Sequence, residues 1–132
     1  METWCDKGRA VVEVEGELDL FTAPVLRDVL TKLSDDGRYF LAVELSGLKF
    51  LDNSGLGVLI GGAKRVVAGG GGLCLAGASD RVVKLLRVTG LLRVMPAFAT
   101  LEEAFGWLDG VREARVATTR TAVPERPAES AS

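Results

Sequence analysis

The stretch Val43–Leu59, VELSGLKFLDNSGLGVL, contains the change of pattern that decides the fold. It begins inside an apolar segment, residues 39–45, and such density of apolar side chains predicts a strand that is covered on both faces. From Leu56 onward, apolar residues recur at helical spacing as far as the glycines at 69–72. The stretch therefore predicts a strand, a loop and a helix, with DNSG at the junction and the glycine run as a flexible turn.

Strands and helices are also expected to alternate toward the N-terminus. Within residues 10–18, Val12 and Val14 alternate with glutamates at 13, 15 and 17, which predicts a half-buried strand. A shorter strand around Trp4 is expected to pair with it. The sequence TAP at Thr22 to Pro24 then predicts a helix start, with a hydroxyl cap and a proline in the first turn. Gly37 is expected to end that helix.

The alternation of strands and helices also continues toward the C-terminus. Residues 73–77 form a short apolar strand, and a helix capped at Ser79 follows and closes near Gly90. Residues 94–99 are a last strand candidate, which Pro96 assigns to an edge of the sheet. A capping box at Thr100 and Glu103 begins a fourth helix.

These segments together predict an α/β fold with a mostly parallel, mixed central sheet of about five strands and about four helices. Residues 1–110 are expected to form one domain. Residues 111–132 are expected to be a disordered C-terminal tail, because alanine, threonine, arginine, proline, glutamate and serine follow one another there without periodicity.

Composition excludes several classes of function. The chain has 132 residues, 16 basic and 18 acidic side chains, and no histidine. Histidine activates most serine and cysteine nucleophiles and ligates most catalytic zinc ions, so we expect no enzyme, no metal and no cofactor. The net charge of -2 gives no sign of the basic surface that binds nucleic acid. Cys5 and Cys74 are interpreted as reduced, structural thiols.

The location follows from the absence of targeting features in this sequence. The N-terminus lacks a signal-peptide pattern, and no stretch approaches the roughly 20 apolar residues that span a bilayer. We therefore expect a cytoplasmic protein that is not inserted in a membrane.

The junction Asp52-Asn53-Ser54-Gly55 has two interpretations. In the first, Asp52, Asn53 or Ser54 caps the helix, while Gly55 and Gly57 let it pack close to the sheet. In the second, the Ser54 hydroxyl is exposed at the positive end of the helix dipole, where a phosphoryl group is well accommodated. Phosphorylation there would repel a partner docked on the loop.

Known phosphate-binding and nucleophile motifs do not fit these glycines. Lys64 is not placed as a Walker A loop requires, and Ile60 stands where a dinucleotide fingerprint needs its last glycine. The residues that flank Ser54 are not those of a nucleophile elbow. Asp19, near the end of the first long strand, is either a turn acid before a capped helix or a surface carboxylate on the face that carries Ser54.

With these segments in hand, the sequence resembles a STAS domain (sulphate transporter and anti-sigma-factor antagonist) of the stand-alone bacterial antagonist type. The resemblance covers about residues 8 to 109. It rests on three ordered motifs: GELDLFTAP at Gly16–Pro24, the stretch Val43–Leu59, and LLRVTGL at Leu85–Leu91.

The resemblance implies partner switching. The unphosphorylated antagonist would bind an anti-sigma factor that is also a serine kinase, and this kinase would end the interaction by phosphorylating Ser54. A separate serine phosphatase would restore the binding form. The family's acidic positions correspond to Asp52 and Asp19. The resemblance implies that the partner binds these positions and their neighbours in the same two loops. The predicted partner-binding residues are Asp19, Thr22, Asp52, Asn53, Ser54, Gly55 and Leu56.

Two positions depart from the family pattern. Asn53 stands where many members have a second hydroxyl residue, and Glu44 stands where an aspartate is usual. The first departure leaves Ser54 as the only hydroxyl in the loop. An alternative function is an accessory or scaffold subunit, for example of a lipid-transport ATPase, without a phosphorylation cycle.

Overall fold

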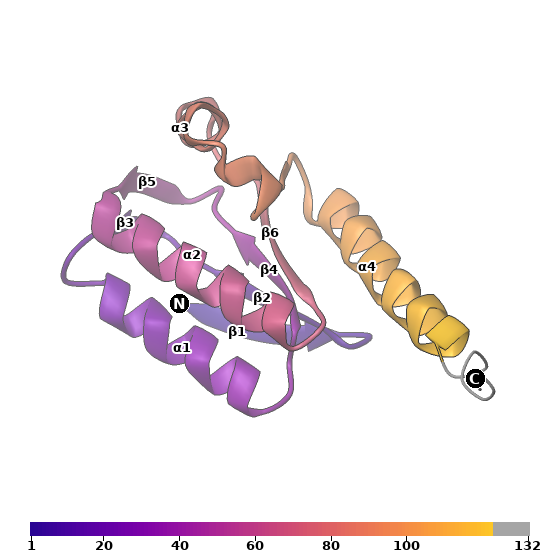
Figure 1. The fold of residues 1–132 in the computed structure, drawn as a ribbon. Coiled ribbons are helices and arrows are strands. Elements are labelled where there is room, and N and C mark those ends of the chain that lie inside the picture. The colour runs from indigo at the N-terminus through magenta and orange to yellow at the C-terminus, as the bar shows by residue number, and fades with distance from the viewer. Residues whose placement is uncertain (123–132) are drawn as a thin grey trace.

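The computed structural model describes residues 1–122, and their side chains as far as residue 115. Within this range a five-stranded sheet, in the order β1-β2-β4-β6-β7, is flanked by α-helices, and a two-stranded sheet, β3-β5, lies at one end (Figure 1). The strands are β1 (Glu2–Asp6), β2 (Arg9–Glu13), β3 (Gly16–Leu18), β4 (Phe40–Glu44), β5 (Leu48–Leu51), β6 (Gly72–Ala76) and β7 (Ala97–Phe98). The helices are α1 (Ala23–Asp35), α2 (Asn53–Ala68), α3 (Asp80–Thr89), α4 (Leu101–Ala122) and the short 3-10 helix η1 (Leu91–Arg93).

The predicted fold class is confirmed. β1 pairs antiparallel with β2, while β2, β4, β6 and β7 are parallel to one another. The strand expected around Trp4 is β1, and β7 lies at the edge to which Pro96 assigned it. Since each parallel crossover needs a connecting segment, the helices lie on the faces of the sheet.

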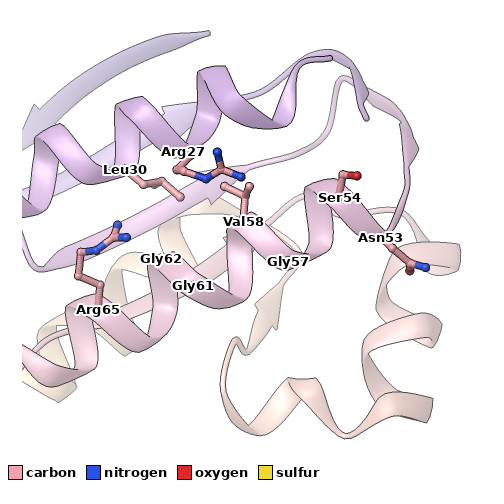
Figure 2. Close-up of a pocket in the computed structure, with 9 residues that line it drawn as sticks. All are labelled: Arg27, Leu30, Asn53, Ser54, Gly57, Val58, Gly61, Gly62 and Arg65. Carbon is pink, nitrogen blue, oxygen red and sulfur yellow. The ribbon is translucent and has the colours of Figure 1, made fainter. Parts of the chain in front are cut away.

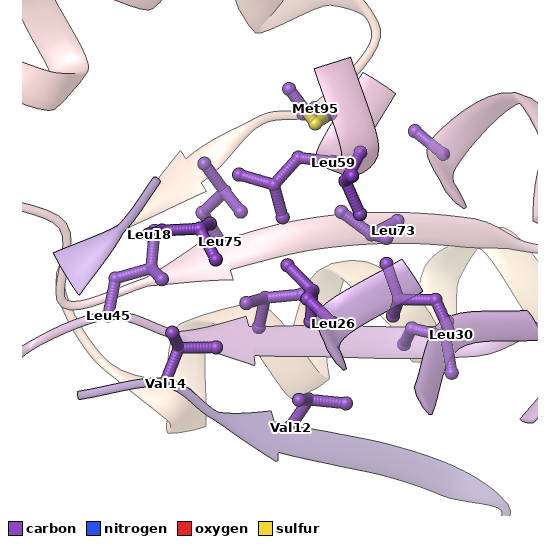
Figure 3. Close-up of a cluster of buried hydrophobic side chains, with 14 of the residues drawn as sticks. Val12, Val14, Leu18, Leu26, Leu30, Leu45, Leu59, Leu73, Leu75 and Met95 are labelled. Atoms are coloured by element: carbon purple, nitrogen blue, oxygen red, sulfur yellow. The ribbon is translucent and has the colours of Figure 1, made fainter. Parts of the chain in front are cut away.

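The inner strands β2, β4 and β6 are buried on both faces, and their alternate residues serve two cores. Val12, Val43 and Leu75 belong to the first core, between the sheet and helices α1 and α2 (Figure 3). Val11 and Cys74 belong to the second core, which packs against α4. This alternation is the two-residue period of a strand.

The helices supply the other side of each core. The first core takes Leu26 and Leu30 from α1 and Leu59 from α2, all at most 1% exposed. The second core takes Ala104 and Leu108 from α4. Burying a leucine fully contributes about 1.5–3 kcal/mol, so these stripes hold the helices to the sheet.

The first long strand, predicted over residues 10–18, is divided in two. The N–H of Val14 still donates to the carbonyl of Glu44, but Gly16 adopts a positive φ of 78° and turns the chain away. β3 then pairs with β5 instead of continuing in the main sheet. The expected half-burial is confirmed from residue 12 to residue 18, where the apolar side chains are buried and the three glutamates are not. It fails at the start of β2, where Val11 and Val12 face opposite sides of the sheet and both are buried.

Helix α4 begins at the predicted capping box and continues beyond the predicted domain boundary at 110. The N–H of Glu103 donates to Thr100 Oγ1, at 3.2 Å. At the other end, the Arg112 guanidinium lies 4.7 Å from the centroid of the Phe40 ring, and its Nη1 donates to the carbonyl of Lys7. Residues 111–122 are therefore helical, not part of a disordered tail. The remaining tail prediction concerns residues 123–132, which lie outside the described part of the chain.

The two cysteines differ in environment. Cys74 is buried in the second core, and burial raises the pKa of its thiol to about 12. Cys5 is exposed on β1, so the expectation of a structural thiol fits Cys74 and not Cys5.

The glycine run at 69–72 is a close-packed segment, which corrects the expectation of a flexible turn. A Cβ atom on Gly71 would lie 1.8 Å from the carbonyl oxygen of Tyr39, and one on Gly72 would lie 2.8 Å from the Trp107 ring. The N–H of Gly72 donates to that same Tyr39 carbonyl. Two backbones meet here at a separation that no side chain permits.

We predict that Gly71→Ala lowers the free energy of unfolding by about 1–3 kcal/mol, because the added methyl group must displace the backbone of Tyr39. Gly61→Ala is the matched control. A Cβ atom there meets open space, and alanine favours the helix by up to about 1 kcal/mol. Urea denaturation of both variants tests the pair, and equal stability of Gly71→Ala and wild type would contradict the close packing.

Candidate functional site

The candidate site lies where β3 and β5 end and helices α1 and α2 begin. Leu18 of β3 is paired with Leu51 of β5, so the two loops that follow leave the small sheet side by side. The N–H of Asp52 donates to the carbonyl of Leu18, at 3.2 Å. The chain thus brings the loop that contains Asp19 against the loop that contains Ser54.

Gly55 permits this close approach. A Cβ atom at this position would lie 2.6 Å from Leu18 Cγ, 2.7 Å from the Leu18 carbonyl oxygen and 2.9 Å from Leu51 Cδ1. Any larger residue would push the start of α2 away from the end of β3. The packing role predicted for Gly55 is therefore confirmed. The same prediction is wrong for Gly57, which is exposed and where a Cβ atom would meet nothing within 4 Å.

Asp52 is the residue that caps α2, which decides among the three candidates left open by the sequence. Its backbone is extended, and its Oδ1 accepts from the N–H of Gly55 at 3.1 Å. The N–H of Leu56 donates to the Asp52 carbonyl and continues the helix. Ser54 is therefore inside the first turn of α2 and is not needed to close it.

The Ser54 hydroxyl makes no hydrogen bond with the residues that the structure describes, although the side chain is half-buried. Other hydroxyls nearby are engaged: Thr22 Oγ1 donates to the carbonyl of Glu17, and Ser79 Oγ accepts from the N–H of Val82. Ser54 also stands at the positive end of the α2 dipole, in a first turn without acidic residues. The capping of α2 therefore does not occupy its oxygen.

Asp19 organises the loop before α1. Its Oδ1 accepts from the N–H groups of Phe21 and Thr22, both at 3.0 Å. These bonds lower the pKa of Asp19, with the Thr22 N–H as the largest cause. The interpretation of Asp19 as a turn acid is confirmed, and its carboxylate also lies at the surface, next to the loop that contains Ser54.

Thr22 does not act as predicted. It occupies the N-cap position of α1, but its side chain makes no capping bond. Its Oγ1 instead accepts from the N–H of Asp19, at 2.9 Å, and so stabilises the turn. No donor is left for a capping bond, because Pro24 has no N–H and the N–H of Val25 already donates to the Thr22 carbonyl.

A shallow groove of about 250 Å³ runs between α1 and α2, beginning at Ser54. Arg27 of α1 and Arg65 of α2 contribute its two cationic groups. Figure 2 shows Ser54 on the side of α2 toward α1, whereas Asn53 points away from the groove.

The described residues form neither a candidate metal site nor a candidate membrane span. No group of three or more histidine, cysteine, aspartate or glutamate side chains is arranged to hold a metal ion in this part of the chain. None of its helices combines the length and the apolar character needed to cross a membrane.

The family is decided by comparison with known proteins. The family model described as "STAS domain" matches residues 2–104. The chain belongs to the STAS domain family. An anti-sigma-B factor antagonist of Bacillus subtilis (strain 168) is 37% identical over 91 residues, which are 69% of this chain and 83% of that protein. One from Staphylococcus aureus (strain NCTC 8325 / PS 47) is 38% identical over 84 residues, 64% of this chain and 78% of that protein.

Solved structures share this STAS fold. An anti-sigma factor antagonist from Mycobacterium paratuberculosis has a TM-score of 0.71 and 25% identity, over 82% of this chain and 92% of that one. The Bacillus cell fate determinant SpoIIAA in its phosphorylated form has a TM-score of 0.66 and 25% identity, over 80% of this chain and 96% of that one. The second structure is of a neighbour that accepts a phosphate.

The partner-binding residues predicted from the sequence gather at one end of the STAS domain but differ in exposure. Asn53 is exposed, Asp19, Asp52 and Ser54 are half-buried, and Gly55 is fully buried. Thr22 and Leu56 are half-buried, and Leu56 packs against the first core. Their role in binding stays a prediction.

Sequence reasoning missed two apolar residues of the same loop. Leu20 is 65% exposed and Phe21 is 83% exposed, directly after Asp19. Large apolar side chains so exposed on a STAS loop are typical of an interaction site. The signal was present in GELDLFTAP, where two apolar residues stand between a turn acid and a helix start. Arg27 gave no such signal, because it looks like any exposed helical arginine.

We predict that Asp19 titrates below its ordinary value of 3.8, because folding supplies N–H donors to its ionised form. A depressed pKa contributes stability that is complete above the unfolded value and is lost as the pH falls through the folded value. Carbon-13 NMR of the carboxyl group should show this midpoint. Thr22→Val should keep most of the depression, since the backbone N–H of residue 22 remains. A wild-type midpoint at or above 3.8 would contradict the hydrogen-bonded turn.

Proposed function

We propose that this STAS protein is an anti-sigma-factor antagonist that binds an anti-sigma factor with serine kinase activity and is released when Ser54 is phosphorylated. The observation that carries the proposal is the Ser54 hydroxyl, which lacks a hydrogen bond among the described residues and stands at the first turn of α2 beside an exposed apolar loop. The relatives named as antagonists support the same role.

The phosphoryl transfer needs only an acceptor from this chain. Ser54 Oγ attacks the γ-phosphorus of ATP bound to the kinase, forming a new O–P bond as the bond from phosphorus to the β,γ-bridging oxygen breaks. ADP leaves, and the hydroxyl proton passes to a base of the kinase. A chain without histidine is suited to be the substrate in this step, with the base and the nucleotide supplied by the partner.

Phosphorylation changes the charge of the binding face without dismantling the fold. It adds about -1.5 to -2 charges near the carboxylates of Asp19 and Asp52. The N-terminus of α2 stabilises a negative group, so the helix itself gains stability. A partner docked on the two loops would meet like-charge repulsion and a new desolvation cost. A serine phosphatase would restore the binding form by hydrolysing the phosphate ester.

The partner-binding face consists of the two loops around Ser54. Leu20 and Phe21 add apolar area to the polar residues predicted from the sequence, and buried aromatic anchors carry much of the affinity in protein interfaces. The proposed interface therefore has an apolar anchor beside a charge-sensitive centre. Affinity would come mainly from the anchor, and control would come from Ser54.

We predict that phosphorylated protein and Ser54→Glu bind the partner at least about tenfold more weakly than wild type, because each adds negative charge at the centre of the interface. Ser54→Ala should bind like wild type and accept no phosphate. The partner is captured from a lysate of the source organism with wild type and Ser54→Glu side by side, then purified and incubated with ATP. Affinities are measured by calorimetry, and mass spectrometry locates the phosphate.

Ser46→Ala is the matched control for this experiment. Its hydroxyl donates to the Glu44 carboxylate at 2.8 Å, so it should not be an acceptor and its loss should leave phosphorylation unchanged. Phosphate on any residue other than Ser54, or equal binding by Ser54→Glu and wild type, would refute the switch. Exclusive capture of membrane-transporter subunits would favour the accessory role.

We predict that Phe21→Ala weakens partner binding by about tenfold or more while leaving the melting temperature nearly unchanged. The side chain is 83% exposed, so its removal costs the free protein little packing. Val67→Ala is the control, since Val67 is 56% exposed in the last turns of α2, far along the helix from Ser54. Equal affinities for Phe21→Ala and wild type would remove the apolar anchor from the proposal.

A further inference from the structure

The groove between α1 and α2 connects Ser54 with a guanidinium group. Ser54 lines one end of it, Arg27 and Leu30 contribute from α1, and Val58 contributes from α2. Figure 2 shows the Arg27 side chain extending from α1 along the groove in the direction of Ser54. The serine and the arginine belong to different helices, 27 positions apart in the sequence, and share one hollow.

Glycines on α2 keep this groove open. Gly57 and Gly61 follow Ser54 by three and seven residues, which puts them on its side of the helix. A Cβ atom at either position would meet nothing within 4 Å. Both glycines line the groove, so no large side chain stands between Ser54 and α1.

Arg27 is available for a new ionic partner. It is exposed, and it makes no salt bridge or hydrogen bond within the part of the chain that the structure describes. The second cation of the groove, Arg65, lies eleven positions after Ser54 on the same helix, which is roughly 16 Å along its axis. That separation exceeds the Debye length of about 8–10 Å in physiological salt. Arg27 is therefore the cation placed to meet a group on Ser54.

We propose that Arg27 receives the phosphate of phosphorylated Ser54 and holds it along the α1–α2 groove. The proposal rests on the proposed phosphorylation of Ser54. A guanidinium can donate two parallel N–H bonds to two phosphate oxygens, and the pair is stronger than one between neutral groups. Phosphorylation then adds a phosphate to the partner-binding face and withdraws the free guanidinium of Arg27 in the adjoining groove.

The test measures the second pKa of the phosphate itself. Phosphoserine is incorporated at position 54 of the full chain during translation, so no kinase is needed, and phosphorus-31 NMR follows the titration. This pKa is ordinarily about 6, and a nearby guanidinium lowers it by favouring the dianion. We expect Arg27→Gln to raise it by about 0.5 unit relative to wild type, and Arg27→Lys to restore part of the difference.

Arg65→Gln is the matched control, because it removes the same charge from the far part of the groove and should leave the phosphate pKa unchanged. The carboxylates of Asp19 and Asp52 and the dipole of α2 act on the phosphate in every variant, so the comparison isolates Arg27. Identical titrations of Arg27→Gln and wild type, or an equal shift in Arg65→Gln, would overturn the proposal.

The outcome is separable from that of the proposed function. If the kinase modifies a residue other than Ser54, the proposed switch fails, while the titration of phosphoserine 54 still reports whether Arg27 contacts it. If the kinase modifies Ser54 and Arg27→Gln leaves the titration unchanged, the switch stands and the role of Arg27 is refuted.

Discussion

The structure depends on the burial of both faces of β2, β4 and β6. Because side chains alternate along a strand, each of these strands must satisfy two cores at once, as Val11 and Val12 do on β2. Helices are then required on both faces, with α1 and α2 on one and α4 on the other. Right-handed parallel crossovers start their helices after the carboxyl ends of the strands, so the N-terminal turns of α1 and α2 and the loops before them gather at one end of the domain.

The candidate site is a consequence of that arrangement. The end of β3 and the start of α2 meet at Gly55, where a side chain would collide with Leu18. This contact positions the acid of one loop beside the serine of the other. Asp52 takes over the capping of α2, which leaves Ser54 without a structural duty. The proposed phosphorylation of Ser54 would therefore break no capping bond of α2.

Regulation by charge suits a STAS protein of this composition. The proposed phosphate would add about -1.5 to -2 charges at one point of the surface, and its transfer would need no catalytic group from a chain without histidine. In the proposals, the apolar loop at Leu20 and Phe21 and the groove with Arg27 have different roles. The loop would give affinity, and the groove would receive the group that ends binding.

Features that depend on local interactions could be predicted from the sequence. Periodicity predicted the strands and helices, and DNSG marked the start of α2, because capping and alternation involve residues within a few positions of one another. The tertiary structure decided the rest: that Gly16 diverts β3 into a second sheet, that α4 continues past residue 110 through contacts such as that of Arg112 with Phe40, and that Arg27 shares a groove with Ser54. These features join residues far apart in the chain, and only the packing of helices on the sheet brings such residues together.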